Sequence, residues 1–392
     1  MFKKIIPYSR QNLDNTEIKL VTRVLKSDFL TQGPLVEKFE NEITNYTNSK
    51  YAMAVNSATS GLHLACMALG LKRNDYLWTT ANSFVASANC GLYCGAKIDL
   101  VDIDLKTFNI SLERLEQKLK KTNKVKLPKI LIIVHFAGNP CEMKKLFALS
   151  RKYKFKIIED ASHALGAKYK NNHIGDCKFS DLCVFSFHPV KSITTAEGGM
   201  VTTNKKNLAL KIKALRTHGI IKDKNYFEIK ENKNKLWHYE QKYLGFNYRM
   251  NDVEAAIGIA QIKKIDKFIY LRKKIFNLYK KILNKLPLIL PINEKECKSS
   301  NHLFIIRIDK TKTNKKRDDL FNYLRKEKIF VNIHYIPIYR HPYYSKIGFL
   351  KKNFQNCEKY YSDCLSIPIY PGLNYREIFK IKKILDKFFN KA

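Results

Sequence analysis

The chain has 392 residues, 45% of them hydrophobic, which is enough to bury the core of one large and one smaller domain. No apolar run approaches the roughly 20 residues that a helix needs to cross a membrane, so we expect no membrane partner. The net charge of +37 invites a nucleic-acid interpretation, but the basic residues are mostly lysines spread through the chain, so we expect no nucleic-acid partner.

The N-terminus and the cysteines both indicate a cytoplasmic protein. Pro7 interrupts the first ten residues before a hydrophobic segment develops, so we expect no signal peptide. The nine cysteines are an odd number at irregular positions without a C-x-x-C pair, which argues for reduced thiols. Cys90 and Cys94 lie one helical turn apart, but no histidine or second cysteine pair accompanies them, so we expect no metal site.

Short β-rich runs alternate with helical patterns over the first 250 or so residues. We predict strands at 51–56, 76–79, 97–102, 129–135, 156–159, 182–187 and 200–203. Helical segments fall between several of them, including 61–70, 112–121 and 142–153. Strands separated by helices predict a mostly parallel α/β sheet that is covered on both faces.

The pattern changes after Asn251. Residues 252–286 form a long helical stretch, and 304–308 and 330–333 have the pattern of strands before a lysine-rich terminal helix. We therefore predict a large domain over residues 1–261 and a smaller α+β domain over residues 262–392.

A run of small hydroxyl residues follows the first predicted strand. The sequence Asn56-Ser-Ala-Thr-Ser-Gly61 opens a helix, so its hydroxyls and free backbone N–H groups can hold a phosphate at the positive end of the helix dipole. Taken alone, such a run is more often an ordinary helix N-cap.

A carboxylate ends the fifth predicted strand. Lys156-Ile-Ile-Glu-Asp160 directs an acid to the edge of the sheet where ligands bind, and a buried anion there requires a cationic partner. A protonated pyridine nitrogen would serve, and this pairing would make the ring an electron sink. Alternatively, Glu159 or Asp160 caps the next helix, and His163 is a structural histidine.

Lys191 follows the sixth predicted strand. His188-Pro189 ends that strand, because proline has no N–H for a sheet ladder and disfavours helix in the residue before it. Lys191 therefore lies on a loop at the carboxyl end of the sheet, where open α/β sheets bind ligands. A partly desolvated lysine there is a nucleophile that forms Schiff bases with carbonyls, although any one lysine of this basic chain is by default a surface residue.

These three features follow three different strands, and together they describe a site for pyridoxal 5′-phosphate (PLP). One holds a phosphate, one supplies an acid for the ring nitrogen, and one supplies a lysine for the aldehyde. Ser186 is a candidate for a further phosphate contact, and Phe84 is a candidate for stacking on the ring. For both residues, packing in the core is an equal alternative.

The sequence resembles the DegT/DnrJ/StrS family of sugar-nucleotide aminotransferases over nearly its whole length. The resemblance rests on SDFLTQGP (27–34), NSATSGLHLA (56–65), VHFAGNP (134–140), IIEDASHALGA (157–167), FSFHPVKSITTAEGGMV (185–201) and GFNYRMNDVEAAIG (245–258). It implies the α/β fold of fold type I PLP-dependent transferases, with a seven-stranded mostly parallel sheet and a smaller C-terminal α+β domain.

The resemblance also implies a role for each matching position. Lys191 would be the Schiff-base lysine, Asp160 the partner of the pyridine nitrogen, His163 the neighbour of the ring's 3′-oxygen and Phe84 the stacking residue. The phosphate-binding positions of the family fall on Ser57, Ala58, Thr59 and Ser186.

Two further consequences concern assembly and reaction class. Asn247 matches an asparagine that reaches into the neighbouring subunit's site, which implies a homodimer with shared active sites. Dehydratases of the family carry histidine in place of the lysine. Because this chain has Lys191, the resemblance implies a transaminase, in which the lysine also moves protons.

Within the family, the likeness is strongest to transaminases of pseudaminic acid biosynthesis, through PYSRQNLD (7–14), LKSDFLTQGP (25–34), HPVKSITTAEGG (188–199) and NIHYIPIY (332–339). This implies transfer of an amino group from L-glutamate to C4 of UDP-2-acetamido-2,6-dideoxy-β-L-arabino-hex-4-ulose. The implied contacts with the UDP-keto-sugar are Tyr8, Asp28, Phe29, Leu30, Thr31, His334 and Tyr335. For the last two, a structural pair beside Pro337 is the alternative, and the lysine-rich segment 221–235 departs from the family pattern.

Competing interpretations remain within and outside the enzymes. A transaminase of another keto sugar, acting at C3 or with the opposite stereochemistry, would have the same motifs near the cofactor. From a different class, the chain could be a nucleic-acid-binding protein or an inactive regulatory relative.

Overall fold

The computed structural model describes residues 5–292 and 296–390. Its centre is a seven-stranded sheet in the order β1-β9-β8-β5-β4-β2-β3. The strands are β1 (Tyr51–Val55), β2 (Tyr76–Thr80), β3 (Lys97–Val101), β4 (Ile130–Val134), β5 (Lys156–Asp160), β8 (Leu182–Ser186) and β9 (Gly199–Thr203). All neighbouring pairs are parallel except the two that β9 makes with β1 and β8. The predicted mostly parallel sheet is therefore confirmed.

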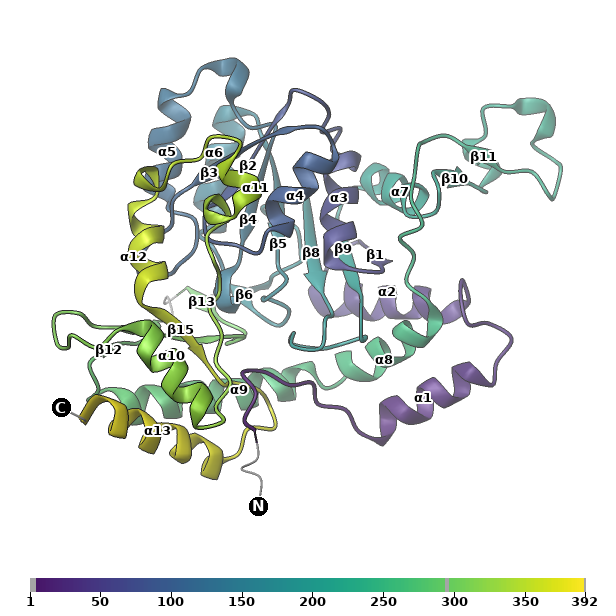
Figure 1. The fold of residues 1–392 in the computed structure, drawn as a ribbon. Coiled ribbons are helices and arrows are strands. Elements are labelled where there is room, and N and C mark those ends of the chain that lie inside the picture. Colours follow the sequence, from purple (N-terminus) through teal and green to yellow (C-terminus); the bar gives the residue numbers. More distant parts are fainter. Residues whose placement is uncertain (1–4, 293–295, 391–392) are drawn as a thin grey trace.

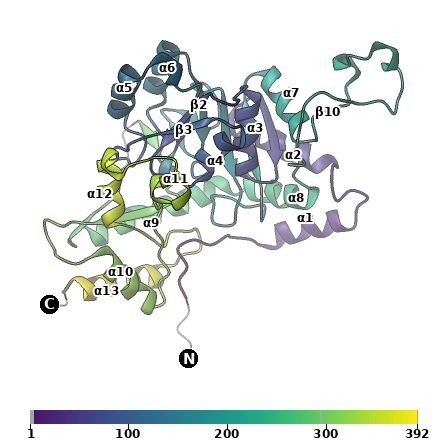
Figure 2. The same ribbon diagram turned by 45° about the horizontal axis from the view of Figure 1, so that its top comes forward.

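Helices cover both faces of this sheet (Figures 1 and 2). One face carries α3 (Ala58–Ala68), α4 (Ala86–Tyr93) and α7 (Lys206–Leu215). The other face carries α2 (Pro34–Thr47), α5 (Leu112–Lys121), α6 (Met143–Tyr153) and α8 (Asp252–Ile262). All five residues of β4, ILIIV, are buried, as expected for a parallel strand that is covered on both faces.

The C-terminal part builds a second, smaller core around a three-stranded antiparallel sheet in the order β12-β14-β15. Its strands are β12 (Leu288–Ile289), β14 (Phe304–Ile308) and β15 (Cys364–Ile367). Its helices are α9 (Ile265–Leu283), α10 (Arg317–Lys326), α11 (Pro342–Ser345), α12 (Gln355–Asp363) and α13 (Tyr375–Asn390). Leu320, Ile381 and Leu385 lie in this core, and the predicted strand 304–308 is confirmed.

Two predicted elements differ from the structure. Residues 330–333 do not form a strand, because this segment makes only a single bridge to β15, through Asn332. The helical stretch 252–286 is interrupted at Lys264, whose amine lies 2.7 Å from the carboxylate of Glu17 in α1 (Asn15–Leu25). A further small sheet, in the order β13-β6-β7, joins β13 (Cys297–Lys298) to β6 (Lys168–Tyr169) and β7 (Asn172–His173) of the large domain.

Residues 219–246 leave the body of the molecule as an arm, drawn in teal in Figures 1 and 2. In this arm, β10 (Ile220–Ile221) pairs antiparallel with β11 (Glu240–Gln241). The lysine-rich segment 221–235 is part of it. Leu236 and Trp237 are 104% and 71% exposed, so side chains that usually seek a core extend into water here.

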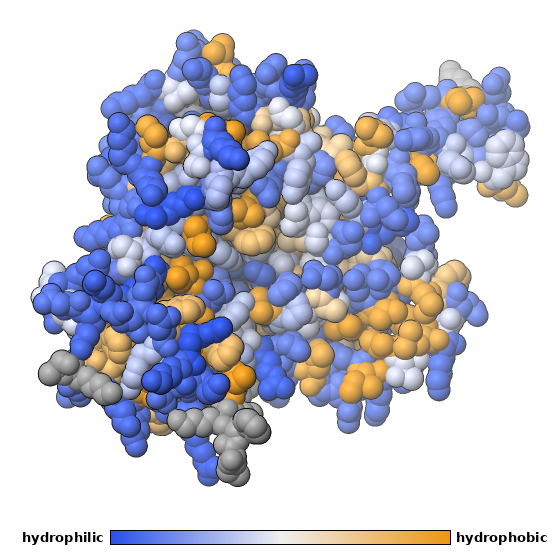
Figure 3. All heavy atoms as spheres, viewed as in Figure 1, coloured by the Kyte–Doolittle hydropathy of each residue, from blue (hydrophilic) through white to orange (hydrophobic). Residues whose placement is uncertain are grey.

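The surface in Figure 3 is mainly hydrophilic, with apolar side chains gathered over α1 and α8. The exposed apolar residues of α1 and of the loop after it are Ile18, Leu25, Phe29 and Leu30. Within residues 5–292 and 296–390, no helix is long and apolar enough to cross a membrane.

Candidate active site

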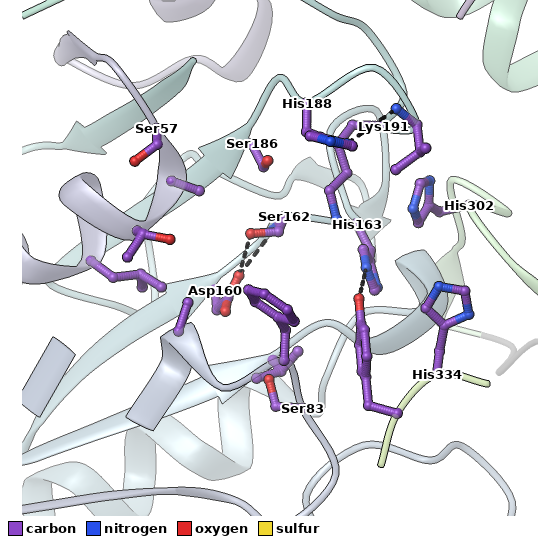
Figure 4. A pocket seen from close by; sticks show the side chains of 18 of the residues that line it. Ser57, Ser83, Asp160, Ser162, His163, Ser186, His188, Lys191, His302 and His334 are labelled. Atoms are coloured by element: carbon purple, nitrogen blue, oxygen red, sulfur yellow. Dashed lines mark hydrogen bonds between the residues drawn. The ribbon is translucent and has the colours of Figure 1, made fainter. Parts of the chain in front are cut away.

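A cavity of about 420 Å³ lies at the carboxyl ends of the central strands (Figure 4). Its wall contains residues from the start of α3, the β2–α4 connection, the ends of β5 and β8, and the C-terminal part of the chain. Of the residues predicted from the sequence, the cavity brings together Tyr8, Ser57, Ala58, Thr59, Phe84, Asp160, His163, Ser186, Lys191, His334 and Tyr335.

Lys191 contributes a nucleophilic amine to this cavity. The lysine follows β8 on a short turn in which its backbone N–H donates to the carbonyl of His188 at 2.9 Å. Burial lowers the pKa of the Lys191 amine to about 8, although the nearby carboxylate of Asp160 acts in the opposite direction. At pH 7 roughly one such amine in ten is neutral and nucleophilic, which is far more than for a free lysine.

Asp160 is the last residue of β5, and its side chain lies in the cavity with a residue exposure of only 5%. Its Oδ1 accepts hydrogen bonds from the hydroxyl and the backbone N–H of Ser162, at 2.6 and 3.2 Å. Its Oδ2 accepts a hydrogen bond from the hydroxyl of Ser87 at 2.6 Å. The carboxylate is therefore held from both sides at the floor of the site.

The predicted phosphate cradle is the N-terminus of α3. Ser57 is the N-cap of this helix, and its hydroxyl oxygen accepts from the backbone N–H of Ser60 at 3.1 Å. It also lines the cavity, so the capping and binding interpretations apply to the same residue. Gly199 packs against this turn: a Cβ at position 199 would lie 2.7 Å from the backbone of Ser57 and of Ala58. Only glycine lets β9 approach the cradle this closely.

A group of aromatic rings forms the opposite wall. His163 Nε2 lies 2.9 Å from the hydroxyl of Tyr335, and the ring of His163 lies 4.5 Å from that of His302. Burial and the neighbouring Lys191 lower the pKa of His163 well below its usual value, so the ring is neutral at pH 7. Phe84 is 57% exposed at the cavity mouth, with its ring 5.9 Å from that of Tyr335.

His334 adds a polar group that is fixed by the small domain. Its Nδ1 lies 2.8 Å from the hydroxyl of Ser366 in β15, and its ring lies 5.4 Å from that of Tyr8. Burial and Lys191 lower the pKa of His334 to about 3. The prediction of a contact with the substrate and the alternative of a structural pair therefore both fit its position.

The described part of the cavity wall has one lysine, Lys191, and no arginine. Its four histidines all have lowered pKa values, mainly through burial. Two carboxylates, Asp160 and Glu197, face the same space. A ligand with several negative charges would therefore need positive groups from outside this chain's own cavity.

Five predicted residues lie outside the cavity wall of their own chain. Asp28, Phe29, Leu30 and Thr31 are exposed on the connection between α1 and α2. Asn247 forms an isolated bridge with Thr217 at the base of the arm. Arg249 follows it by two residues and has no hydrogen bond or ion pair among the described residues.

Sequence reasoning missed several residues of the wall, namely Ser83, Ser162, Glu197, His302 and Asn332. Ser162 lies inside the stretch 157–167 that matches the family, so the sequence could have indicated it. His302 had no local signal, because its place beside His163 depends on how the small domain packs on the large one.

A sequence profile of the DegT/DnrJ/EryC1/StrS aminotransferase family matches residues 11–386. The chain is 40% identical over 390 residues to the UDP-4-amino-4,6-dideoxy-N-acetyl-beta-L-altrosamine transaminase of Campylobacter jejuni subsp. jejuni serotype O:2, covering 99% of this chain and 98% of that protein.

Solved structures give the same answer. Helicobacter pylori PseC, described as an aminotransferase involved in the biosynthesis of pseudoaminic acid, superposes with a TM-score of 0.87 at 32% identity, covering 98% of this chain and 99% of that chain. Spr1654 of Streptococcus pneumoniae in its PLP form superposes with a TM-score of 0.88 at 25% identity, covering 98% of both chains. Because the family profile and a 40% identical relative both span nearly all of its length, the protein belongs to the DegT/DnrJ/EryC1/StrS aminotransferase family.

Proposed function

We propose that this sugar aminotransferase moves the amino group of L-glutamate to C4 of a UDP-linked 4-keto-6-deoxy-N-acetylhexosamine, UDP-2-acetamido-2,6-dideoxy-β-L-arabino-hex-4-ulose, in pseudaminic acid biosynthesis. The observation that carries the proposal is the 40% identity to the C. jejuni altrosamine transaminase over 99% of the chain. The likeness to PseC supports the same pathway. Glutamate loses its amine and leaves as 2-oxoglutarate, and the keto oxygen of the sugar is replaced by that amine.

The cofactor is PLP, and the residues present fit it. A hydroxyl-rich helix N-terminus suits its phosphate, a buried carboxylate suits its ring nitrogen, and a lysine of lowered pKa suits its aldehyde. His163 Nδ1 is buried without a partner in the described structure, and we assign it to the side of the ring that bears the 3′-oxygen. When bound, PLP supplies a carbonyl that carries the amino group and a ring that accepts electrons.

The chain's own groups would then bind the cofactor, orient the substrates and move protons between them. The amine of Lys191 takes a proton from Cα of the donor and later returns one to C4 of the sugar. Asp160 keeps its negative charge at the ring nitrogen. Phe84 and Tyr335 cover the mouth of the cavity, and Tyr8 and His334 face the side from which we expect the sugar.

A second copy of the chain would complete the site. The described cavity wall offers a single lysine and no arginine, yet PLP, glutamate and a UDP-sugar all bring negative charge. Asn247 and Arg249 lie outside their own cavity, and α1 and the following loop expose apolar side chains that a partner would cover. We therefore propose a homodimer in which Asn247 and Arg249, together with Asp28–Thr31, contact ligands in the neighbouring site.

Two further expectations stay proposals. The separate core of the C-terminal part supports the division into a large domain, 1–261, and a small domain, 262–392, although Ile6 packs in the small core and Ile265 and Phe268 pack in the large one. A cytoplasmic location rests on the cysteine pattern and the N-terminal residues of the sequence.

The direct test is to incubate the purified protein with L-glutamate and candidate UDP-keto sugars and to identify the product by NMR. We expect an amino group at C4 of the named sugar and release of 2-oxoglutarate. Amination at C3, the opposite configuration at C4, or turnover only with another nucleotide sugar would refute the substrate assignment and leave the aminotransferase class in place.

A further inference from the structure

Two serine hydroxyls clamp the carboxylate of Asp160. Ser87 approaches Oδ2 from α4 at 2.6 Å, and Ser162 approaches Oδ1 from the turn after β5, also at 2.6 Å. The second of these contacts is drawn in Figure 4. Asp160 is 5% exposed and Ser87 is fully buried, so no solvent competes for the bond between them. A carboxylate has about four acceptor sites, and these serines fill three of them if the backbone N–H of Ser162 is counted.

The direction of the hydrogen bonds follows from the number of protons. The backbone N–H and the hydroxyl of Ser162 both donate to Oδ1. An ionised carboxylate only accepts, so the single hydroxyl proton of Ser87 points to Oδ2. The hydroxyl of Ser83 lies 2.7 Å from that of Ser87, and it must be the donor of that pair because Ser87 has no second proton. The three groups therefore form a chain of donors, Ser83 to Ser87 to Asp160.

The backbone fixes this chain in place. Ser83 lies on the bend that leads into α4, and Ser87 lies in the first turn of the helix, so the chain reversal before α4 brings the two hydroxyls together. Phe84 lies on the same turn, and its carbonyl accepts from the backbone N–H of Ser87 at 3.2 Å. The segment that would cover the ring of the cofactor thus also sets the hydrogen bonds of the acid beneath it.

We propose that Ser87 and Ser162 are positioning residues that keep Asp160 ionised and keep the shared proton on the ring nitrogen of the cofactor, while Ser83 polarises Ser87. The proposal rests on the proposed pairing of Asp160 with that nitrogen. Donors stabilise the negative charge of a carboxylate, and this effect is strongest where water is excluded. Without them, the carboxylate would draw the proton from the ring, and the ring would become a poorer electron acceptor.

The experiment measures where the proton is. The enzyme and its variants Ser87→Ala, Ser162→Ala and the double variant are loaded with PLP labelled with ¹⁵N in the ring, and the ¹⁵N chemical shift is recorded. We expect each single variant to move the shift toward that of a neutral pyridine, and the double variant to move it further. Ser83→Ala should produce a smaller change in the same direction, and Ser162→Thr should keep the wild-type shift.

Kinetics give a second readout. Each alanine variant should lower kcat by about tenfold, the effect of losing one hydrogen bond to a charged group, while the KM for glutamate changes by less than about threefold. Ser150→Ala is the matched control, because Ser150 is also buried but donates only to the carbonyl of Phe147 in α6. Its shift and its kcat should match those of the wild type.

The outcomes separate this proposal from the function. If the wild-type enzyme does not attach PLP to Lys191, the proposed function fails. If it does, and Asp160→Asn shifts the ¹⁵N signal while the serine variants do not, the role of the serines is refuted and the function stands. If circular dichroism shows that Ser87→Ala does not fold, Ser83→Ala and Ser162→Ala still test the proposal. An unchanged ¹⁵N shift in both of them contradicts it.

Discussion

His163 and Tyr335 are 172 residues apart in the sequence, and the ring nitrogen Nε2 of one lies 2.9 Å from the hydroxyl of the other. This bond joins the large sheet to the C-terminal part of the chain across the cavity. The backbone N–H of Tyr335 donates in addition to the side-chain oxygen of Asn82, at 3.1 Å. The small domain therefore sets the orientation of a histidine that follows β5.

Removing this hydroxyl should impair catalysis more than folding. In Tyr335→Phe, the buried Nε2 of His163 loses its partner, and we expect kcat/KM to fall by about tenfold while PLP content stays near one per chain. Steady-state kinetics and the absorbance of the bound cofactor check this. Tyr343→Phe is the control, because Tyr343 is 63% exposed. A Tyr335→Phe enzyme with wild-type kcat/KM would contradict the assigned role.

Loss of the nucleophile should abolish turnover. We expect Lys191→Ala to have less than about a thousandth of the wild-type rate, because no other lysine lines the described cavity wall and could take over attachment of the cofactor and proton transfer. Its circular dichroism and its melting temperature should remain close to those of the wild type. Lys121→Ala, on the exposed end of α5, serves as the control for the change of charge. Near-normal activity of Lys191→Ala would refute the site.

The lowered pKa of Lys191 predicts the pH dependence of its reactivity. Only the neutral amine attacks, so in the cofactor-free enzyme the rate of modification should rise with pH, reach half its maximum near pH 8, and level off above pH 9. An ordinary lysine would reach half its maximum near pH 10.4. Mass spectrometry after brief acetylation at a series of pH values measures this for Lys191, and Lys121 provides the reference in the same sample. A Lys191 profile that overlays the reference would contradict the prediction.

A single methyl group at Gly199 should disturb the phosphate cradle. In Gly199→Ala, the new Cβ would lie 2.7 Å from the backbone of Ser57, so the turn must move away from β9. We expect the affinity for PLP to fall by about tenfold or more, which corresponds to about 1.4 kcal/mol, as measured by titration of the cofactor-free enzyme. Gly372→Ala is the control, because its Cβ would meet nothing closer than 3.8 Å.

The proposed homodimer with shared sites predicts that two inactive variants restore activity when mixed. Lys191→Ala lacks the amine but keeps Asn247, and a chain with Asn247→Ala and Arg249→Ala has the opposite defect. After subunits are exchanged at random, half of the dimers are mixed and each has one intact site, so about a quarter of the wild-type activity should return. Activity equal to the average of the unmixed samples would show that each chain builds its own site.

The sequence predicted the central sheet well because its strands are buried on both faces and therefore have nearly continuous apolar runs, as in β4. It also located Lys191, because His188-Pro189 marks where β8 must end. The strand predicted at 330–333 was wrong. Its apolar pattern is real, but Asn332 makes a single bridge to β15 and no ladder follows. Pairing of this kind depends on the neighbours that the fold provides.

The polar network of the site was harder to predict. Ser83 precedes α4 and Ser87 lies in its first turn, and only the tertiary fold brings the Ser87 hydroxyl to Asp160 at the end of β5. The interruption of the helix at Lys264 was likewise not predicted, because no glycine or proline marks it in the sequence. At this break the amine of Lys264 contacts Glu17, 247 residues away in the chain. Residues of this kind are defined by what they touch in three dimensions.

The arm of residues 219–246 has a consequence for handling the enzyme. Leu236 and Trp237 remain exposed to water, although the ring of Trp237 contacts that of His238, so a lone protomer carries an apolar surface that favours association. Assembly that covers such side chains depends on concentration, and the folded state of each protomer is stabilised along with it. Dilution should therefore lower both the activity and the stability of this protein, and concentrated solutions should preserve both.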